Sequence, residues 1–216
     1  MAITLYMVAP SPAVRAVQIT AKALGIELKE KPLNFMEGEH LKPEYLKINP
    51  QHTVPTIVEE DGFTLWDSNA INAYLVSKYG KNDSLYPKDL KKRAIVDQRL
   101  HFNNGVAFAT GLKIIGAILR AGKTKIDDQD REELNRVYGF VEAFLQSKQW
   151  IAGDSVTIAD YNLYATLSAM NVLVPIDAQK YPKVAAWYKK VDALPEVDVS
   201  KEGLAKFEAM IKSKLK

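Results

Sequence analysis

The stretch VPTIVEEDGFTLWDSNAINAYLVSKYG, residues 54–80, decides the fold class of this chain. It holds two short apolar runs joined by Asp61-Gly62, a dipeptide that favours the tight turn of a β-hairpin. Asp67 or Ser68 can then cap a helix that ends at Gly80. We therefore expect a hairpin followed directly by a helix.

The residues before this stretch complete an α/β unit. The run ITLYMV, residues 3–8, predicts a buried strand, and PAVRAVQITAKALG, residues 12–25, predicts a helix with one apolar stripe. IELKEKPL, residues 26–33, predicts a second strand, which a right-handed crossover would pair parallel to the first. The turn-rich segment 34–52 has room for one short helix. The expected element order is βαβαββα.

After residue 80 the strand signals disappear. KNDSLYPKD, residues 81–89, is typical of a polar linker. From Leu90 to the end the pattern is helical, with breaks near glycine and proline residues, namely Gly122, Gly153, Pro175 and Pro195. This shift predicts an α/β domain over residues 1–80, a linker over 81–89 and an all-helical domain over 90–216.

The composition excludes several kinds of chemistry. The chain has no cysteine, which excludes disulfides, thiolate metal sites and a cysteine nucleophile. Its 3 histidines are scattered along the chain, so we expect no metal cofactor. Any thiol chemistry must therefore use a thiol that a ligand supplies.

Charge and hydropathy are those of a soluble protein. The 29 basic and 26 acidic residues are interspersed and give a net charge of +3, so we expect no nucleic-acid partner. No apolar run approaches the ~20 residues of a membrane span. The N-terminus also lacks the basic start and cleavage site of a signal peptide. We expect a cytoplasmic location and no membrane contact.

Ser11 lies between two prolines at the expected start of the first helix. A serine just before a proline is well suited to cap a helix, and local sequence favours this interpretation. The alternative is a hydrogen-bond donor to an anion at the helix N-terminus. A hydrolase nucleophile is disfavoured, because the chain has no G-x-S-x-G elbow around this serine.

Two dipeptides in the opening stretch each allow two interpretations. A cis bond at Val54-Pro55 would leave the Val54 backbone free to pair with an extended peptide, whereas a trans edge proline is the commoner case. Asp67 with Ser68 can hold the ammonium and carboxylate of an amino-acid head, or merely cap the helix. Local sequence alone favours the simpler interpretation at both places.

Other polar residues carry weaker signals. Thr157 and Asp160 in VTIAD have the spacing of a capping box, and we assign them to folding. His40, His52 and His101 are each isolated in the sequence, so solvent exposure or a local hydrogen bond is the default for each.

An apolar stripe recurs at helical spacing in the second half of the chain. It contains Phe108, Leu112, Ile115 and Leu119. Such a stripe usually belongs to the core, but it can also form one wall of an apolar pocket where another domain faces it.

Several sequence blocks in the same order resemble the cytosolic glutathione transferases. The blocks are SPAVRAVQITAKALG, LKPEYLKINPQHTVPTIVEEDGFTLWDSNAINAYLVSKYG, LYPKD, VTIADYNL and YPKVAAWYKKVDALPEV. The resemblance is to the insect delta and epsilon classes, and SLYPKDLKKRAIVDQRLHFNNGVAF favours epsilon. It extends from Ile3 to Val197.

The resemblance implies a thioredoxin-like N-terminal domain that binds glutathione as co-substrate, followed by an all-helical C-terminal domain. It implies that Ser11 donates a hydrogen bond to the glutathione sulfur. It further implies that the Val54 backbone, beside a cis Pro55, pairs with the cysteinyl part of glutathione. The remaining implied contacts are Asp67 and Ser68 at the γ-glutamyl head and His52, with His40 as its neighbour, at the glycyl carboxylate.

The resemblance also implies a function and a second site. The implied hydrophobic substrate site contains Phe35, Phe108, Leu112, Ile115, Leu119 and Phe207. A homodimer is expected to conjugate the glutathione thiolate to hydrophobic electrophiles, as in detoxification. The alternatives are a non-catalytic ligand-binding member of the fold and a dedicated glutathione-dependent isomerase or peroxidase.

Three places in the sequence depart from the family pattern. Ala13 and Val14 stand where proline and cysteine are common in the family motif. Asn69 stands where the related classes often carry arginine or histidine. Leu112 stands near a position where some epsilon members carry arginine.

Overall fold

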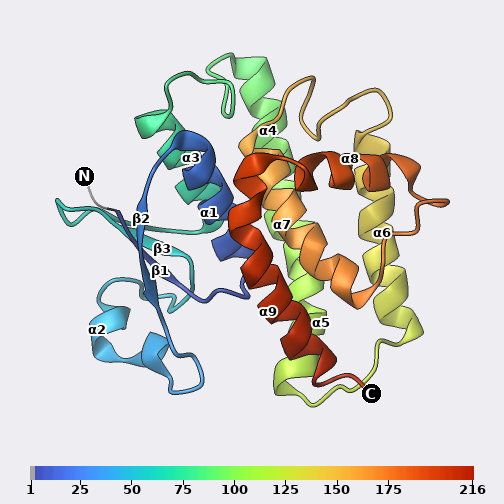
Figure 1. Ribbon diagram of the computed structural model, residues 1–216, viewed down its shortest axis with the longest axis horizontal. Helices are drawn as coiled ribbons and strands as arrows, with labels where there is room; N and C mark the ends of the chain where they lie inside the picture. Colours follow the sequence, from blue (N-terminus) through green and yellow to red (C-terminus); the bar gives the residue numbers. More distant parts are fainter. Residues whose placement is uncertain (1–2) are drawn as a thin grey trace.

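The computed structural model describes residues 3–216, and its N-terminal part contains one mixed sheet (Figure 1). The sheet order is β2-β1-β3-β4, with β1 parallel to β2 and antiparallel to β3, and β3 antiparallel to β4. The strands are β1 (Ile3–Met7), β2 (Leu28–Pro32), β3 (Thr56–Val58) and β4 (Thr64–Trp66). The predicted parallel crossover and the hairpin are confirmed.

Helices accompany this sheet in the predicted order. α1 (Pro12–Leu24) follows β1, and α3 (Ser68–Tyr79) follows β4. Between β2 and β3, where the sequence indicates one short helix, the chain forms two short helical turns, η1 (Glu39–Leu41) and α2 (Pro43–Leu46). The arrangement is the βαβαββα order of a thioredoxin-like domain.

The limits of α1 follow from its sequence. Pro12 occupies the first turn, where its missing N–H costs no hydrogen bond. Gly25 ends the helix at a φ of +70°, a conformation that glycine adopts without strain. Val14 and Val17 are completely buried in the N-terminal core with residues of the sheet and α3, whereas Ile19 packs in the core of the helical domain. The helix therefore packs against both parts of the chain, through different apolar residues.

The second part of the chain is helical. Its elements are α4 (Leu90–Phe102), the π-helical turn η2 (Asn103–Phe108), α5 (Ala109–Arg120), α6 (Asp128–Phe144), α7 (Ile158–Leu173), α8 (Pro182–Asp192), the 3-10 turn η3 (Pro195–Ser200) and α9 (Lys201–Lys212). No helix or strand lies in residues 81–89. The domain limits at residues 80 and 90 remain predictions.

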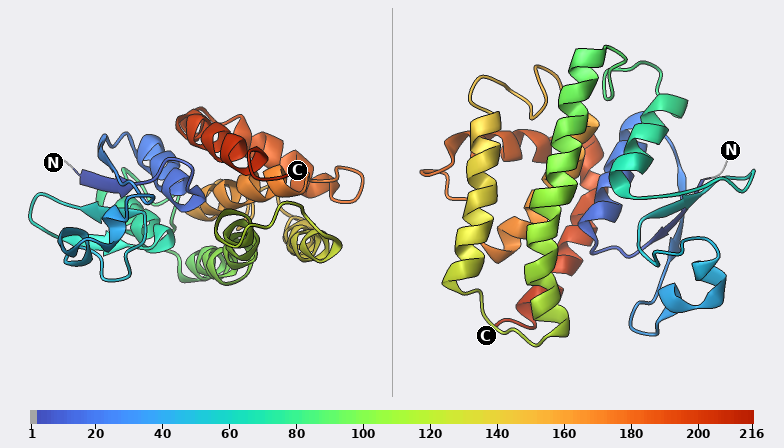
Figure 2. Two further views of the ribbon diagram at one scale, coloured as in Figure 1. Left: turned by 90° about the horizontal axis from the view of Figure 1, so that it is seen from below. Right: turned by 180° about the vertical axis from the view of Figure 1, so that it is seen from behind.

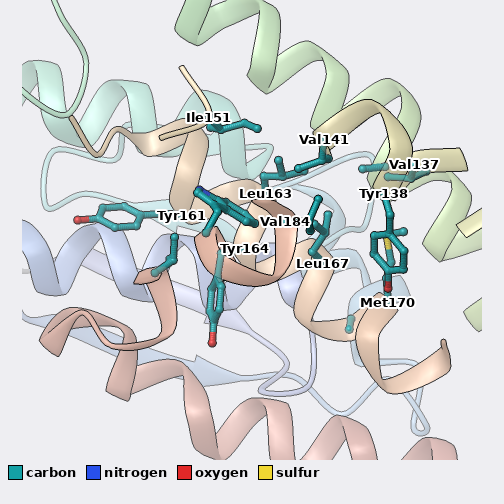
Figure 3. Close-up of a cluster of buried hydrophobic side chains, with 14 of the residues drawn as sticks. Val137, Tyr138, Val141, Ile151, Tyr161, Leu163, Tyr164, Leu167, Met170 and Val184 are labelled. Atoms are coloured by element: carbon teal, nitrogen blue, oxygen red, sulfur yellow. The ribbon is translucent and has the colours of Figure 1, made fainter. Parts of the chain in front are cut away.

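The helix α7 forms the centre of the helical domain. Its side chains are buried on nearly every side by α1, α4, α8 and α9. Figure 3 shows Leu163 and Leu167 of α7 among side chains that include Val141 of α6 and Val184 of α8. A helix with such all-round burial needs an apolar sequence, and this one is rich in alanine, leucine and tyrosine.

The start of α7 is fixed by Asp160, which is completely buried. The predicted capping box with Thr157 is confirmed, and the Asp160 carboxylate accepts a hydrogen bond from the Thr157 N–H at 2.8 Å. It also accepts from the Ile151 N–H and the Trp187 indole N–H, each at 2.9 Å. Asp160 thus joins α7 to α8 and to the loop before α7, which agrees with its assignment to folding.

One long helix in the described residues 3–216 has the length and apolar composition of a membrane span. It is the continuous segment Leu90–Arg120, made of α4, η2 and α5, with 31 residues. Figure 2 shows it as one rod, with α6 on one side and α3 on the other. Its apolar residues Val96, Leu100, Ile114 and Ile118 pack in the core of the helical domain. The absence of membrane contact remains a prediction.

Candidate active site

The sheet register brings the predicted glutathione-site residues to one end of the sheet. Tyr6 of β1 pairs with Thr56 of β3, which pairs with Trp66 of β4. Ser11 follows β1, Pro55 immediately precedes this row, and Asp67 immediately follows it. Segments separated by more than fifty residues of sequence therefore emerge at the same edge of the sheet.

The segment after β2 emerges at this edge as well. β2 runs parallel to β1, and its last residue, Pro32, pairs with Met7. The chain then continues through Phe35 and His40 to the loop before β3. The topology thus gathers the carboxyl ends of three strands and the amino end of the fourth.

Ser11 caps α1 and still keeps its hydroxyl hydrogen for a ligand. Its Oγ accepts a long hydrogen bond of 3.4 Å from the Val14 N–H. Within residues 3–216, no protein acceptor receives the Ser11 O–H. The side chain is half-buried at the helix N-terminus, where backbone N–H groups and the helix dipole favour an anion. The two interpretations of Ser11 are therefore compatible.

The helical domain supports the loop that carries Ser11. A Cβ atom on Gly203 of α9 would lie 2.4 Å from the Ala9 carbonyl oxygen, so only glycine fits at that point. Arg15, one turn after Ser11, is completely buried and donates to the Ser168 hydroxyl and the Ala165 carbonyl of α7. Burial lowers the pKa of Arg15 to about 10. The position of Ser11 thus depends on both domains.

The Val54-Pro55 peptide bond is cis, as the family resemblance implied. Across the described chain, no hydrogen bond engages the backbone N–H or C=O of Val54. The loop before it is held by Asn49, which is completely buried and donates to the Thr53 carbonyl at 3.0 Å. The Val54 backbone is therefore free to pair with an extended peptide, in the manner of an added strand.

Asp67 caps α3 from a backbone conformation that is unusual for a non-glycine residue, with a φ of +71°. Its Oδ1 accepts from the Asn69 N–H at 2.8 Å and the Ala70 N–H at 3.2 Å. Its Oδ2 accepts from the Asn104 side-chain amide at 2.8 Å. The capping interpretation is confirmed, and the carboxylate remains exposed to solvent. Ser68, the first residue of α3, is half-buried beside it.

His40 and His52 lie together, although each is isolated in the sequence. Their ring centroids are 6.1 Å apart, and His40 stacks on Phe35 at 4.0 Å. Burial and the neighbouring His52 lower the pKa of His40, whose Nδ1 is buried without a partner. His52 has a positive φ of 48°. His101 lies elsewhere, on α4, and lines a hollow between α3 and α4.

The predicted apolar stripe does not belong to the core as a whole. Leu112 and Leu119 are 45% and 36% exposed, because α5 buries its neighbouring face through Ile114 and Ile118. Phe108 is half-buried, and Ile115 is half-buried against the core. The core interpretation of the stripe is therefore wrong for its exposed residues, which leaves the pocket-wall interpretation open.

The prediction that Phe207 lines the substrate site is wrong. This side chain is 2% exposed and packs in the core of the helical domain. The face of α9 that is turned inward carries Gly203, Phe207 and Ile211 at helical spacing. A substrate has no access to Phe207, because this face is covered by the rest of the domain.

Sequence reasoning missed the contact between Asn104 and the site. Asn104 lies in the π-helical turn η2 and lines, with Asp67 and Asn69, a hollow of about 310 Å³ between α3 and α4. Asn69 donates to the Leu100 carbonyl at 3.1 Å across the same boundary. No local sequence pattern predicts these contacts, because the partners are more than thirty residues apart.

Among the described residues, no group of His, Asp and Glu is arranged to hold a metal ion.

Comparison with known proteins identifies the relatives of this chain. Residues 1–77 match the family model of the glutathione S-transferase N-terminal domain, and residues 106–195 match that of the C-terminal domain. The chain is 45% identical over 196 residues to glutathione S-transferase 1 of Manduca sexta, covering 90% of this chain and 89% of the relative.

Two solved structures are similar throughout. An epsilon-class glutathione S-transferase from the housefly, Musca domestica, is 46% identical, with a TM-score of 0.95 and 98% of both chains covered. A glutathione transferase homologue from Drosophila mojavensis with bound glutathione is also 46% identical, with a TM-score of 0.95 and with 99% of this chain and 97% of that chain covered.

Proposed function

This chain belongs to the glutathione S-transferase family, and on that premise we propose that Ser11 activates glutathione for attack on hydrophobic electrophiles. The observation that carries the proposal is the free O–H of Ser11 at the N-terminus of α1. It lies at the same sheet edge as the cis Val54-Pro55 bond and the Asp67 cap. These residues form the candidate site, with glutathione as co-substrate.

Ser11 acts by making the bound thiol more acidic. A free thiol has a pKa of ~8.5 and is only a few per cent ionised at neutral pH, whereas the thiolate is the nucleophile. A hydrogen-bond donor and a helix N-terminus both favour the anion, and together they can lower the pKa of the bound thiol to ~6.5. Most of the bound glutathione is then ionised at pH 7, with its proton released to solvent.

The other residues of the site orient the tripeptide. The free Val54 backbone pairs with the cysteinyl residue, which directs the sulfur toward Ser11. The Asp67 carboxylate and the N-terminus of α3 hold the ammonium and carboxylate of the γ-glutamyl head. His52 and His40 receive the glycyl carboxylate. The γ-glutamyl head thus meets a carboxylate and a helix N-terminus, and the glycyl carboxylate meets two imidazoles.

The electrophile binds beside the sulfur on apolar side chains of both domains. Phe35 comes from the segment after β2, and Phe108, Leu112, Ile115 and Leu119 come from η2 and α5. The sulfur forms a bond to the electrophilic carbon, and the leaving group departs with the electron pair of the broken bond. Proximity of the two reactants supplies much of the remaining rate.

Steady-state conjugation tests the proposal. We expect wild type to conjugate glutathione to 1-chloro-2,4-dinitrobenzene with release of chloride, and Ser11→Ala to lower kcat ~100-fold, the usual effect of removing one donor to a reacting anion. Ser155→Ala, which removes an exposed serine from a loop of the helical domain, serves as the control. Binding of glutathione without conjugation by wild type would instead support a non-catalytic binding protein.

We also propose that the protein is a cytoplasmic homodimer. Members of the family generally dimerise, and the relatives are insect glutathione S-transferases of the soluble class. Sedimentation equilibrium of the purified chain should give twice the monomer mass of 24.2 kDa. A monomer mass at micromolar concentration would contradict the proposed assembly.

A further inference from the structure

The helical domain reaches the expected γ-glutamyl site through one side chain, Asn104. Its amide Nδ2 donates a hydrogen bond of 2.8 Å to Oδ2 of Asp67, 37 residues earlier in the sequence. The other oxygen of Asp67 is engaged by the backbone N–H groups at the start of α3. The Asp67 carboxylate is therefore held by two elements from different domains.

A local irregularity of the long helix accompanies this contact. α4 and α5 are joined by the π-helical turn η2 (Asn103–Phe108), and Asn104 is its second residue. A π turn contains more residues per turn than an α-helix, so it rotates the side chains that follow, and such turns often occur at functional sites. Asn103 is buried in this turn, whereas Asn104 is exposed at the edge that meets α3.

A second amide supports the same boundary. The Asn69 side chain donates to the Leu100 carbonyl at the C-terminal end of α4, at 3.1 Å. Asn69, Asp67 and Asn104 all line the 310 Å³ hollow between α3 and α4. The N-terminus of α3 is thus fixed against the long helix by two side-chain amides, and the hollow beside them gives a ligand access to the Asp67 carboxylate.

We propose that Asn104 is a positioning residue that orients the Asp67 carboxylate toward the ammonium of the γ-glutamyl head, so that the helical domain takes part in glutathione recognition. This inference rests on the proposed function. Asn104 does not touch the reacting sulfur. Its loss should therefore weaken glutathione binding and leave the chemistry of the bound thiolate unchanged.

Ligand binding to Asn104→Ala tests the proposal. The first ligand is S-hexylglutathione, which has no free thiol. The second ligand carries a glutaryl group in place of the γ-glutamyl group of S-hexylglutathione, so it lacks only the ammonium. We expect Asn104→Ala to raise the Kd of S-hexylglutathione ~5- to 50-fold, as for a lost hydrogen bond to a charged group. The Kd of the deaminated analogue should change less than twofold, because it has no ammonium for Asp67 to bind.

Kinetics and two further variants sharpen the test. Asn104→Ala should raise KM for glutathione with kcat within twofold of wild type, and Asn104→Gln, which keeps the amide donor on a longer chain, should recover part of the affinity. Asn135→Ala removes a half-buried asparagine of α6 and should bind S-hexylglutathione like wild type.

The outcomes separate this inference from the proposed function. If wild type binds S-hexylglutathione and Asn104→Ala binds it equally well, the role of Asn104 is overturned while the proposed function stands. The same holds if Asn104→Ala weakens both ligands equally. If wild type does not bind S-hexylglutathione, the proposed function fails and the role of Asn104 fails with it.

Discussion

The guanidinium of Arg15 donates a hydrogen bond of 2.8 Å to the hydroxyl of Ser168, across the boundary between the two parts of the chain. Arg15 belongs to α1, and Ser168 belongs to the central helix α7. The same guanidinium donates to the Ala165 carbonyl, and no carboxylate of the described chain forms an ion pair with it. A buried cation therefore donates to neutral acceptors of the neighbouring domain, while its Nε–H is buried without a partner.

Arg15→Lys should destabilise the protein by ~2 kcal/mol, because a single ammonium cannot replace the planar fork that reaches both acceptors. Urea unfolding followed by tryptophan fluorescence measures this change. Arg131→Ala, at an exposed position on α6, should change the unfolding free energy by less than ~0.5 kcal/mol. A variant as stable as wild type would show that the contact with α7 is dispensable.

Glu59 gives the stability of the N-terminal domain a pH dependence. Burial opposes ionisation of Glu59, but hydrogen bonds from Lys78, Tyr79 and Tyr74 outweigh it and lower the pKa of the carboxyl. A carboxyl with a lowered pKa stabilises the fold above its ordinary pKa, and this contribution is lost as the pH falls through the folded-state value. Wild type should therefore lose stability as the pH falls below about 4.5.

Glu59→Gln should remove this pH dependence and cost ~1–3 kcal/mol at pH 7. Chemical denaturation at several pH values between 3 and 7 compares it with Glu44→Gln, an exposed position on α2. The unfolding free energies of the two variants should differ at pH 7 and become equal in acid. If the unfolding free energies of wild type and Glu59→Gln changed in parallel with pH, this role of Glu59 would be contradicted.

Asp160 should matter for folding and leave catalysis unaffected. Its carboxylate accepts from Thr157, Ile151 and Trp187 and is completely buried. Asp160→Ala leaves these donors unpaired and should cost ~3–5 kcal/mol, whereas Asp154→Ala at an exposed position should cost little. Thermal unfolding measures the loss. A variant that kept its melting temperature and lost turnover would move Asp160 into the active site.

His40 should make glutathione binding dependent on pH. Burial and the nearby His52 lower the pKa of His40 in the free protein, while Glu39 and Lys42 lie on the same short segment. A bound carboxylate favours the imidazolium, so binding takes up a proton. The affinity for S-hexylglutathione should fall as the pH rises through the pKa of His40 in the complex.

Calorimetric titration in buffers of different ionisation enthalpy measures the proton uptake. The ligand in which the glycyl carboxylate is an amide provides the control, because it offers the imidazolium no charge. His40→Gln should make the affinity for S-hexylglutathione less dependent on pH, because this variant has no imidazole to take up the proton. Equal proton uptake with the acid and the amide would place the carboxylate away from His40.

Local sequence signals account for most of the fold. The hairpin, the α3 helix and the capping box of α7 arise from residues within a few positions of one another, such as Asp61-Gly62 and Thr157 with Asp160. The positions of Ser11, Pro55 and Asp67 at one edge follow from the strand order, once that order is known. These parts of the candidate site were predictable because they lie at the ends of recognisable elements.

Contacts between distant segments were not predictable in this way. Periodicity identifies an apolar stripe on α5 but does not tell which neighbouring face the domain buries, and the structure buries Ile114 and Ile118. The family resemblance places Phe207 in the substrate site, although α9 turns this side chain into the core. The bond from Asn104 to Asp67 depends on a π turn and on domain packing, neither of which has a local signature.

The ultraviolet absorbance of the bound glutathione thiolate tests the central claim most directly. Difference spectra of glutathione with wild type and with Ser11→Ala, titrated from acid to mild alkali, give the pKa of the bound thiol in each protein. We predict a pKa well below the free value of ~8.5 in wild type and a return toward that value in Ser11→Ala, with glutathione still bound. An unshifted thiol in both proteins would show that Ser11 is only a helix cap.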